Sequence, residues 1–351
     1  MTPRRATRTV MVRDVPIGSG HPIPVQSMVT TKTTDIYPTL NQIRNMEVAG
    51  CDIVRVTVPD EESARCLPQI REGIKIPLVA DIHFNYRVAL AALEAGVDKL
   101  RINPGNIGER KRVEAVVDKA QQKKVPIRIG VNAGSLERDL LDRDGHPTPA
   151  ALVESALRHV RILEEMEFTD IIVSLKSSRV PLMIEAYRIM SNERDYPLHL
   201  GVTEAGPMES GTIKSSIGIG TLLAEGIGDT IRISLAADPV HEVRVGKKIL
   251  QSLGLRDEGV NVVACPSCGR CEIDLIGLTE KVEEATKGLD KNLTIAVMGC
   301  AVNGPGEARE ADIGYAGGRG EGLLFVKGQK SRKIREEDFL GELLREVENF
   351  K

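Results

Sequence analysis

The sequence predicts an α/β fold, a (β/α)8 TIM barrel followed by a small α+β domain, and three observations lead to it. From residue 22 to about residue 253, short β-branched runs alternate with amphipathic helical stretches. Eight such units are present, which is the number that closes a parallel barrel. After Gly254 the alternation stops, and cysteines and glycines become frequent. We therefore expect a substrate-binding barrel over residues 1–254 and a second domain over 255–351.

The expected barrel strands are short and apolar, as strands buried on both faces are. They are residues 22–28, 52–58, 77–82, 99–102, 127–131, 170–175, 198–203 and 230–235. The helices expected between them have apolar residues at helical spacing. They are residues 38–49, 63–72, 86–95, 109–123, 149–166, 180–192, 213–225 and 239–253. An open doubly wound sheet competes, but it would rarely need eight units and would want a Gly-rich turn after the first strand, where Ser27-Met28-Val29 stands.

The second domain is expected to begin with a polar linker at residues 255–259. Apolar runs predict strands at 260–264, 293–298 and 323–327, and helices are predicted at 278–287 and from about Glu336 onward. The Gly-rich tract 314–322 is interpreted as a turn between strands rather than as a phosphate loop.

The amino-acid composition limits the kinds of partner and the location that the protein can have. The chain has 351 residues, a net charge of −3, 3% aromatic residues and no tryptophan, which argues against nucleic acid and anionic membranes as partners. Its N-terminus has no apolar segment of the signal-peptide kind, and we expect a cytoplasmic protein. Six cysteines in such a chain favour metal ligation over disulfides.

Basic side chains stand at the carboxyl ends of the expected barrel strands, where barrels carry their active sites. They are accompanied by polar residues, and the set is Arg55, Arg101, Asn103, Arg128, Asn132, Lys176, Arg232 and Ser234. A single strand-end arginine usually pairs with a nearby carboxylate, but Asp52, Asp98 and Asp170 lie at the opposite strand ends. Five cations at one mouth therefore predict a small substrate with two phosphate groups.

Three residues at the same strand ends are candidates for proton transfer: Asp81, His83 and Glu204. Glu204 is the strongest candidate, because a carboxyl group placed among many cations indicates a specific function. His83 alone could equally make a structural hydrogen bond.

Four cysteines in the last quarter of the chain predict a metal centre. Cys265, Cys268 and Cys271 follow a C-x2-C-x2-C spacing, and Cys300 comes from a distant Gly-rich segment. Structural zinc usually takes its ligands as two close pairs, and Cys300 has no such partner, so the spacing favours an iron–sulfur cluster over zinc. Cys51 and Cys66 lie on expected barrel elements and are interpreted as inert thiols.

Seven segments form a specific set: VRVTVP (54–59), ADIHF (80–84), LRINPGNIG (100–108), IGVNAGSL (129–136), LGVTEAG (200–206), CPSC (265–268) and MGCAVNGPGE (298–307). Together they resemble the 4-hydroxy-3-methylbut-2-enyl diphosphate synthase family in its short two-domain bacterial form, over nearly the whole chain. The resemblance implies an iron–sulfur oxidoreductase of the non-mevalonate isoprenoid pathway. Its substrate would be 2-C-methyl-D-erythritol 2,4-cyclodiphosphate, and its product the linear 4-hydroxy-3-methylbut-2-enyl diphosphate.

The resemblance also implies a [4Fe–4S] cluster held by Cys265, Cys268, Cys300 and Glu307, which leaves Cys271 outside the ligand set. The implied partners are a ferredoxin or flavodoxin as electron donor and a second copy of the chain. Two other classes of protein stay open. A corrinoid- or pterin-dependent transferase could use such a barrel but would not need five cations at its mouth. A zinc-stabilised binding module would explain the cysteines but would give the strand-end arginines no function.

Overall fold

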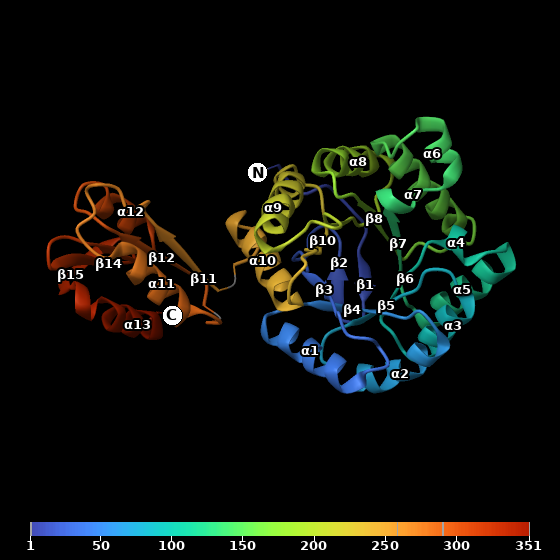
Figure 1. The fold of residues 1–351 in the computed structure, drawn as a ribbon, viewed down its shortest axis with the longest axis horizontal. Coiled ribbons are helices and arrows are strands. Elements are labelled where there is room, and N and C mark those ends of the chain that lie inside the picture. The colour runs from blue at the N-terminus through green and yellow to red at the C-terminus, as the bar shows by residue number, and fades with distance from the viewer. Residues whose placement is uncertain (1, 258, 290, 351) are drawn as a thin grey trace. The chain divides into compact units, whose positions relative to one another are not determined.

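The computed structural model describes residues 2–257, 259–289 and 291–350, and the chain forms two compact units, Met1–Arg256 and Asp257–Lys351 (Figure 1). Among the described residues, no helix is long and apolar enough to cross a membrane.

The first unit is a closed parallel barrel. A six-stranded sheet runs in the order β3 (Gln26–Met28), β4 (Ile53–Thr57), β5 (Leu78–Asp81), β6 (Lys99–Arg101), β7 (Ile127–Asn132) and β8 (Ile171–Lys176). The strands β9 (His199–Leu200) and β10 (Thr230–Ile231) pair with each other. Parallel bridges between Val173 and Leu198 and between Val25 and Ile231 join the two sheets into a ring. The predicted TIM barrel is confirmed.

Helices surround the strands, as Figure 1 shows. One helix follows each strand: α1 (Ile36–Val48), α2 (Glu61–Glu72), α3 (Tyr86–Glu94), α5 (Arg110–Lys123), α7 (Pro149–Glu164), α8 (Val180–Glu193), α9 (Met208–Ala224) and α10 (Pro239–Ser252). Their apolar faces pack on the outward strand residues, such as Val54, Leu100 and Val173, in one continuous core. This core holds the strand ends, and therefore their polar side chains, in fixed positions.

A short hairpin closes the amino-terminal end of the barrel. It consists of β1 (Val10–Val12) and β2 (Val15–Ile17), which pair antiparallel. Val12 and Ile17 pack with the inward residues Ile53, Val79 and Ile172 into a separate apolar cluster, together with Val10. The barrel interior thus has an apolar floor under its polar mouth.

The expected barrel elements are present, with three kinds of difference. The strands expected at 198–203 and 230–235 shorten to two residues each, because the chain leaves the ladder early at the mouth. The helix expected from residue 213 begins at Met208, directly after Pro207, so its polar, Gly-containing first turns were not recognised. The hairpin and two short helices in the mouth loops, α4 (Pro104–Ile107) and α6 (Arg138–Asp144), were not predicted, because so few residues carry no clear periodicity.

The second unit is an α+β domain, as predicted. Its sheet has the order β11 (Val260–Ala264), β12 (Leu293–Met298), β13 (Ile313–Ala316), β14 (Glu321–Val326) and β15 (Gln329–Arg335), with the first three strands parallel and the last two antiparallel. The helices α11 (Leu275–Thr286) and α13 (Phe339–Asn349) share one apolar cluster with the sheet. The helix α12 (Gly304–Glu310) contributes Ala308 to another, with Ala316 and Phe325.

The Gly-rich tract does form a turn between β13 and β14, as expected. The strand β15 was not predicted, because it is an exposed edge strand with the polar sequence QKSRKIR. Such basic edge strands protect a sheet against pairing with other chains. The helix α12 was not predicted either, because GPGEARE begins with two glycines and a proline; Pro305 is tolerated there because it lies in the first turn.

Candidate active site

Arg101, Asn103 and Gly130 form a tightly bonded group at the barrel mouth. The Arg101 guanidinium donates to the Gly130 carbonyl at 2.7 Å, and the Asn103 amide both donates to that carbonyl at 3.1 Å and accepts from the Gly130 N–H at 2.8 Å. A Cβ atom at Gly130 would lie 2.5 Å from the Arg101 Nε, so only glycine allows this approach. The group holds the Arg101 guanidinium in one orientation.

Asp81 lies between two of the predicted cations. Its carboxylate is 3.7 Å from the Arg55 Nε and 3.4 Å from an Arg101 Nη. Burial opposes ionisation of this carboxyl, but Arg55 and Arg101 outweigh it and lower its pKa. Asp81 is therefore a carboxylate at neutral pH. Asp81, a candidate for proton transfer in the sequence analysis, is thus the carboxylate that faces both Arg55 and Arg101.

Arg232 also faces a carboxylate, because Glu242 on α10 lies 3.6 Å from its guanidinium. Arg128 and Lys176 differ: among the described residues, no carboxylate lies within ion-pair distance of either. Arg128 is 1% exposed and donates to the Ser174 hydroxyl at 2.9 Å, while its Nε and second Nη have no partner. The Arg232 Nε is likewise buried without a partner. Buried guanidinium N–H groups without acceptors are what an anion site presents before its ligand binds.

The remaining predicted residues at the mouth are less enclosed. Asn132 ends β7 and Ser234 follows β10, and both are half-buried. Glu204 and His83 are exposed in the loops after β9 and β5. Glu204 has a φ of 51°, in the left-handed region that non-glycine residues avoid. Residues with this backbone conformation occur in turns and are enriched at active sites.

The barrel also contains polar residues that the sequence interpretation missed: Gln26, Lys99 and His199. Lys99 is fully buried and donates to the Gln26 side-chain oxygen at 3.1 Å, and burial together with Arg128 and Arg55 lowers its pKa. Lys99 lies two residues before Arg101 on β6, so the alternation of a strand would have placed it on the same inward face.

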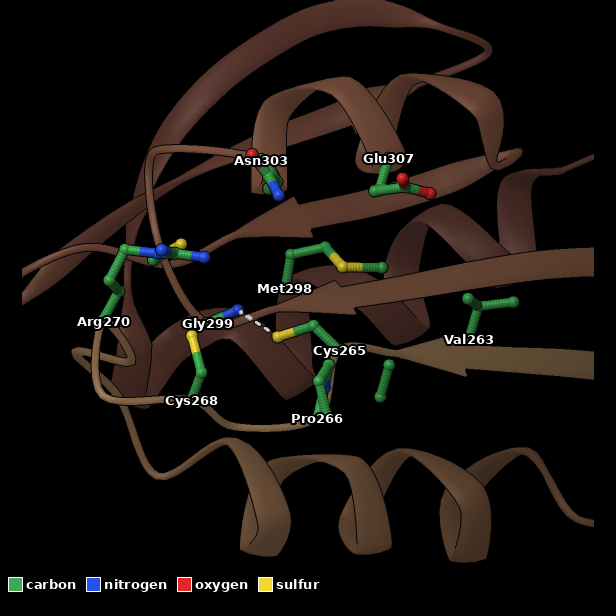
Figure 2. A pocket seen from close by; sticks show the side chains of 12 residues that line it. Val263, Cys265, Pro266, Cys268, Arg270, Met298, Gly299, Asn303 and Glu307 are labelled. Carbon is green, nitrogen blue, oxygen red and sulfur yellow. Dashed lines mark hydrogen bonds between the residues drawn. The ribbon is translucent and has the colours of Figure 1, made fainter.

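A cavity of about 330 Å³ lies at the carboxyl ends of β11 and β12. Cys265, Cys268, Cys300 and Glu307 all line it, and Figure 2 shows the two cysteines of the β11 loop with Glu307 on α12 across the pocket. Sequence interpretation missed Arg270, Met298 and Asn303, which line it as well. Among the described residues, no three Cys, His, Asp or Glu side chains converge on the space of a single ion. The cysteines and Glu307 surround a cavity rather than a point.

Backbone N–H groups face two of these thiols. The N–H groups of Val302 and Asn303, at the start of α12, lower the pKa of the Cys300 thiol. The Gly299 N–H donates to the Cys265 sulfur at 3.4 Å (Figure 2). Thiolates are the form that binds metals, so these two thiols, together with Cys268 and the Glu307 carboxylate on the same cavity, fit the implied [4Fe–4S] cluster as a donor set.

Cys271 is turned away from the cavity. Its thiol donates to the Ile273 carbonyl oxygen at 3.4 Å and packs against the apolar cluster of the α+β unit. A Cβ atom at Gly299 would lie 2.4 Å from its sulfur, so Cys271 fills the space behind the Gly299 backbone. In the barrel, Cys51 is buried and burial raises its pKa to about 12, which makes it the inert thiol expected.

Comparison with known proteins identifies the family. Residues 7–247 match the model of the GcpE TIM-barrel domain, and residues 261–349 match that of the GcpE protein C-terminal domain. The chain belongs to the GcpE family. Three similar curated proteins carry the name 4-hydroxy-3-methylbut-2-en-1-yl diphosphate synthase (flavodoxin), which confirms the family predicted from the sequence.

These GcpE relatives match along almost their whole length. The protein of Symbiobacterium thermophilum is 59% identical and covers 99% of this chain and 94% of its own. That of Geobacter sulfurreducens is 58% identical, with 97% of each chain covered, and that of Caldanaerobacter subterraneus is 57% identical, with 98% and 97% covered. The predicted function and enzyme class are confirmed at the level of the family.

Among solved structures, the GcpE barrel is similar to dihydropteroate synthases. The enzyme of Yersinia pestis gives a TM-score of 0.52 at 11% identity and covers 71% of this chain and 98% of its own. That of Vibrio fischeri gives 0.51 at 13% identity, with 70% and 98% covered. At such identities the likeness shows the barrel fold alone, and it does not favour the pterin-dependent alternative.

Proposed function

We propose that the barrel mouth binds the cyclic diphosphate of the family reaction and that the cysteine cavity holds the cluster that supplies its electrons. The reaction is the reductive ring opening and dehydroxylation of 2-C-methyl-D-erythritol 2,4-cyclodiphosphate to 4-hydroxy-3-methylbut-2-enyl diphosphate. Two electrons and one proton enter, a ring C–O bond to phosphate breaks, and one hydroxyl leaves as water. The observation that carries the proposal is the buried Arg128 with unpartnered N–H groups, inside a barrel of this family.

The cations of the mouth would hold the two phosphates. Arg128 and Lys176 are the primary ligands in this proposal, because no carboxylate of the described residues neutralises them. Arg55, Arg101 and Arg232 complete the binding site, with Asn132 and Ser234 as neutral donors at its rim. Asp81 and Asn103 orient Arg55 and Arg101 through the contacts described, so we assign Asp81 a positioning role instead of proton transfer.

Cys265, Cys268, Cys300 and Glu307 would hold the [4Fe–4S] cluster. When bound, this cluster supplies the substrate with two electrons, one at a time. The three cysteines anchor it as thiolates, and Glu307 is an oxygen ligand, which binds iron more weakly than a thiolate does. The donor printed in the names of the relatives is flavodoxin, and we propose a flavodoxin or ferredoxin as the electron donor here. We also propose a homodimer, as the resemblance implies, and a cytoplasmic location.

Glu204 would donate the proton that leaves with the hydroxyl, and His83, in the loop after β5, remains a second candidate for proton transfer in this proposal. Replacing Glu204 by glutamine keeps the size and the hydrogen-bonding ability of the side chain but removes the transferable proton. We expect turnover with reduced flavodoxin to fall by roughly 10²- to 10⁴-fold while the dissociation constant of the cyclic diphosphate stays within about threefold. Steady-state kinetics and calorimetric binding measure the two quantities.

Glu209, an exposed acid in the first turn of α9, provides the matched control. Glu209→Gln should leave both turnover and binding unchanged. Turnover of Glu204→Gln equal to that of the unmodified enzyme would exclude Glu204 as the proton donor.

A further inference from the structure

A buried lysine below Arg101 on β6, Lys99, has no role in the proposed binding site. Lys99 is fully buried, and in the β5–β6 register it lies beside Val79, which belongs to the apolar floor. Its hydrogen-bond partner on β3, Gln26, is in register with Ile53 of the same floor. Lys99 therefore lies one inward position below Arg101 on the same strand, at the register level where Arg55 pairs with Val79; Arg128 likewise pairs with Ile172 of the floor.

The surroundings of Lys99 are rich in cations and poor in anions. Its side-chain partner is the neutral Gln26 amide, and among the described residues no carboxylate lies within ion-pair distance of its amine. The charged and titratable groups that the other barrel elements bring to this interior are Arg55 on β4, Asp81 on β5, Arg101 on β6, Arg128 on β7, Lys176 on β8, His199 on β9, Arg232 on β10 and Glu242 on α10. Both carboxylates of this set already face arginines.

A buried ammonium without a counter-charge is costly, and a lysine in that position releases its proton. Arginine cannot do so, because its guanidinium keeps its proton in proteins. In the ligand-free barrel the excess positive charge is therefore lowered by proton loss from buried lysines, not from arginines. Burial and the charges of Arg128 and Arg55 lower the pKa of Lys99, in agreement with this argument.

We propose that Lys99 is unprotonated in the ligand-free enzyme and takes up a proton when a diphosphate occupies the mouth. This inference rests on the proposed function. The reaction increases the negative charge at the mouth, since the cyclic diphosphate carries one charge on each phosphate and the linear product carries one more. Lys176 would touch the phosphates in both states and contributes to both equally. In this proposal Lys99 does not contact the phosphates, so its proton occupancy follows the total charge of the ligand and is greatest with the product bound.

Calorimetric titrations in buffers of different ionisation enthalpy count the protons taken up on binding. At pH 8 the terminal phosphate of the product is fully ionised, because its second pKa is near 6, so the count belongs to the protein. We expect proton uptake with both diphosphates in the unmodified enzyme, and more with the linear product than with the cyclic substrate. In Lys99→Met the uptake with the product should be lower by up to about one proton and the difference between the ligands should vanish, while Lys111→Met, at an exposed position of α5, behaves as the unmodified enzyme.

The unmodified enzyme provides a second test that needs no variant. Binding coupled to proton uptake becomes tighter as the pH falls, so the affinity for the product should rise between pH 9 and pH 7.5. Binding of either diphosphate without proton uptake overturns the inference and leaves the proposed function standing. Uptake that Lys99→Met retains and Lys176→Met abolishes assigns the proton to Lys176 and also overturns it. If the unmodified enzyme binds neither diphosphate, the proposed function itself fails, and the inference with it.

Discussion

Cys300→Ser protein should fold, contain no stable [4Fe–4S] cluster and have no measurable turnover. Cys300 lines the cavity at the start of α12, where backbone N–H groups favour its thiolate, and serine cannot supply a thiolate to iron. Its side chain is not part of any of the three apolar clusters of the α+β unit, so the substitution leaves the core intact. Iron analysis, the visible spectrum of the anaerobic protein and circular dichroism measure the three quantities.

Cys271→Ser is the matched control, because Cys271 stands in the β11 loop with Cys265 and Cys268 but donates to the Ile273 carbonyl and does not line the cavity. We expect it to keep about four irons per chain and most of its activity. Loss of the cluster in Cys271→Ser with retention in Cys300→Ser would reverse the proposed ligand assignment.

Replacing Arg128 by methionine should have opposite effects on substrate binding and on stability. The guanidinium is a primary phosphate ligand in our proposal, and a hydrogen-bonded charge of this kind is worth about 1.5–3 kcal/mol, so the dissociation constant of the cyclic diphosphate should rise roughly 10- to 100-fold. In the ligand-free enzyme the same group is a buried charge without a carboxylate partner. Removing it should stabilise the protein by about 1–4 kcal/mol. Calorimetric binding and thermal unfolding test both changes.

Arg188 on α8 is a suitable control, because it pairs with Glu225 on the outer surface of the barrel. Arg188→Met should leave substrate affinity unchanged and change stability by no more than about 0.5 kcal/mol. Unchanged affinity in Arg128→Met would place the phosphates elsewhere, and a large loss of stability would show that Arg128 is needed for folding.

The barrel could be predicted because its elements repeat. Each strand from β4 to β8 has apolar outward residues, such as Val54 and Leu100, and each is followed by an amphipathic helix, so two periodicities agree along the chain. The hairpin β1–β2 and the edge strand β15 have no such signal. The hairpin strands are three residues long, and β15 buries only Ile334 of its seven residues, so tertiary contacts and not local pattern determine them.

The sequence predicted which residues gather at the site in each unit, but it did not predict all of their contacts. The positions of Arg55, Arg101 and Arg128 at strand ends predicted that they meet at the barrel mouth. They could not show that Asp81 lies between two of them, because this depends on the register of β4, β5 and β6. In the second unit, spacing grouped Cys271 with Cys265 and Cys268. Only the three-dimensional course of the loop turns its thiol toward the Ile273 carbonyl.

Anaerobic purification, followed by the visible spectrum before and after dithionite and by counts of iron and zinc, tests the central claim most directly. We expect a brown protein with about four irons per chain, an absorption band that dithionite bleaches, and turnover of the cyclic diphosphate when a reduced flavodoxin is supplied. A colourless protein that holds one zinc, even after reconstitution with iron and sulfide, would contradict the account and make the α+β unit a scaffold.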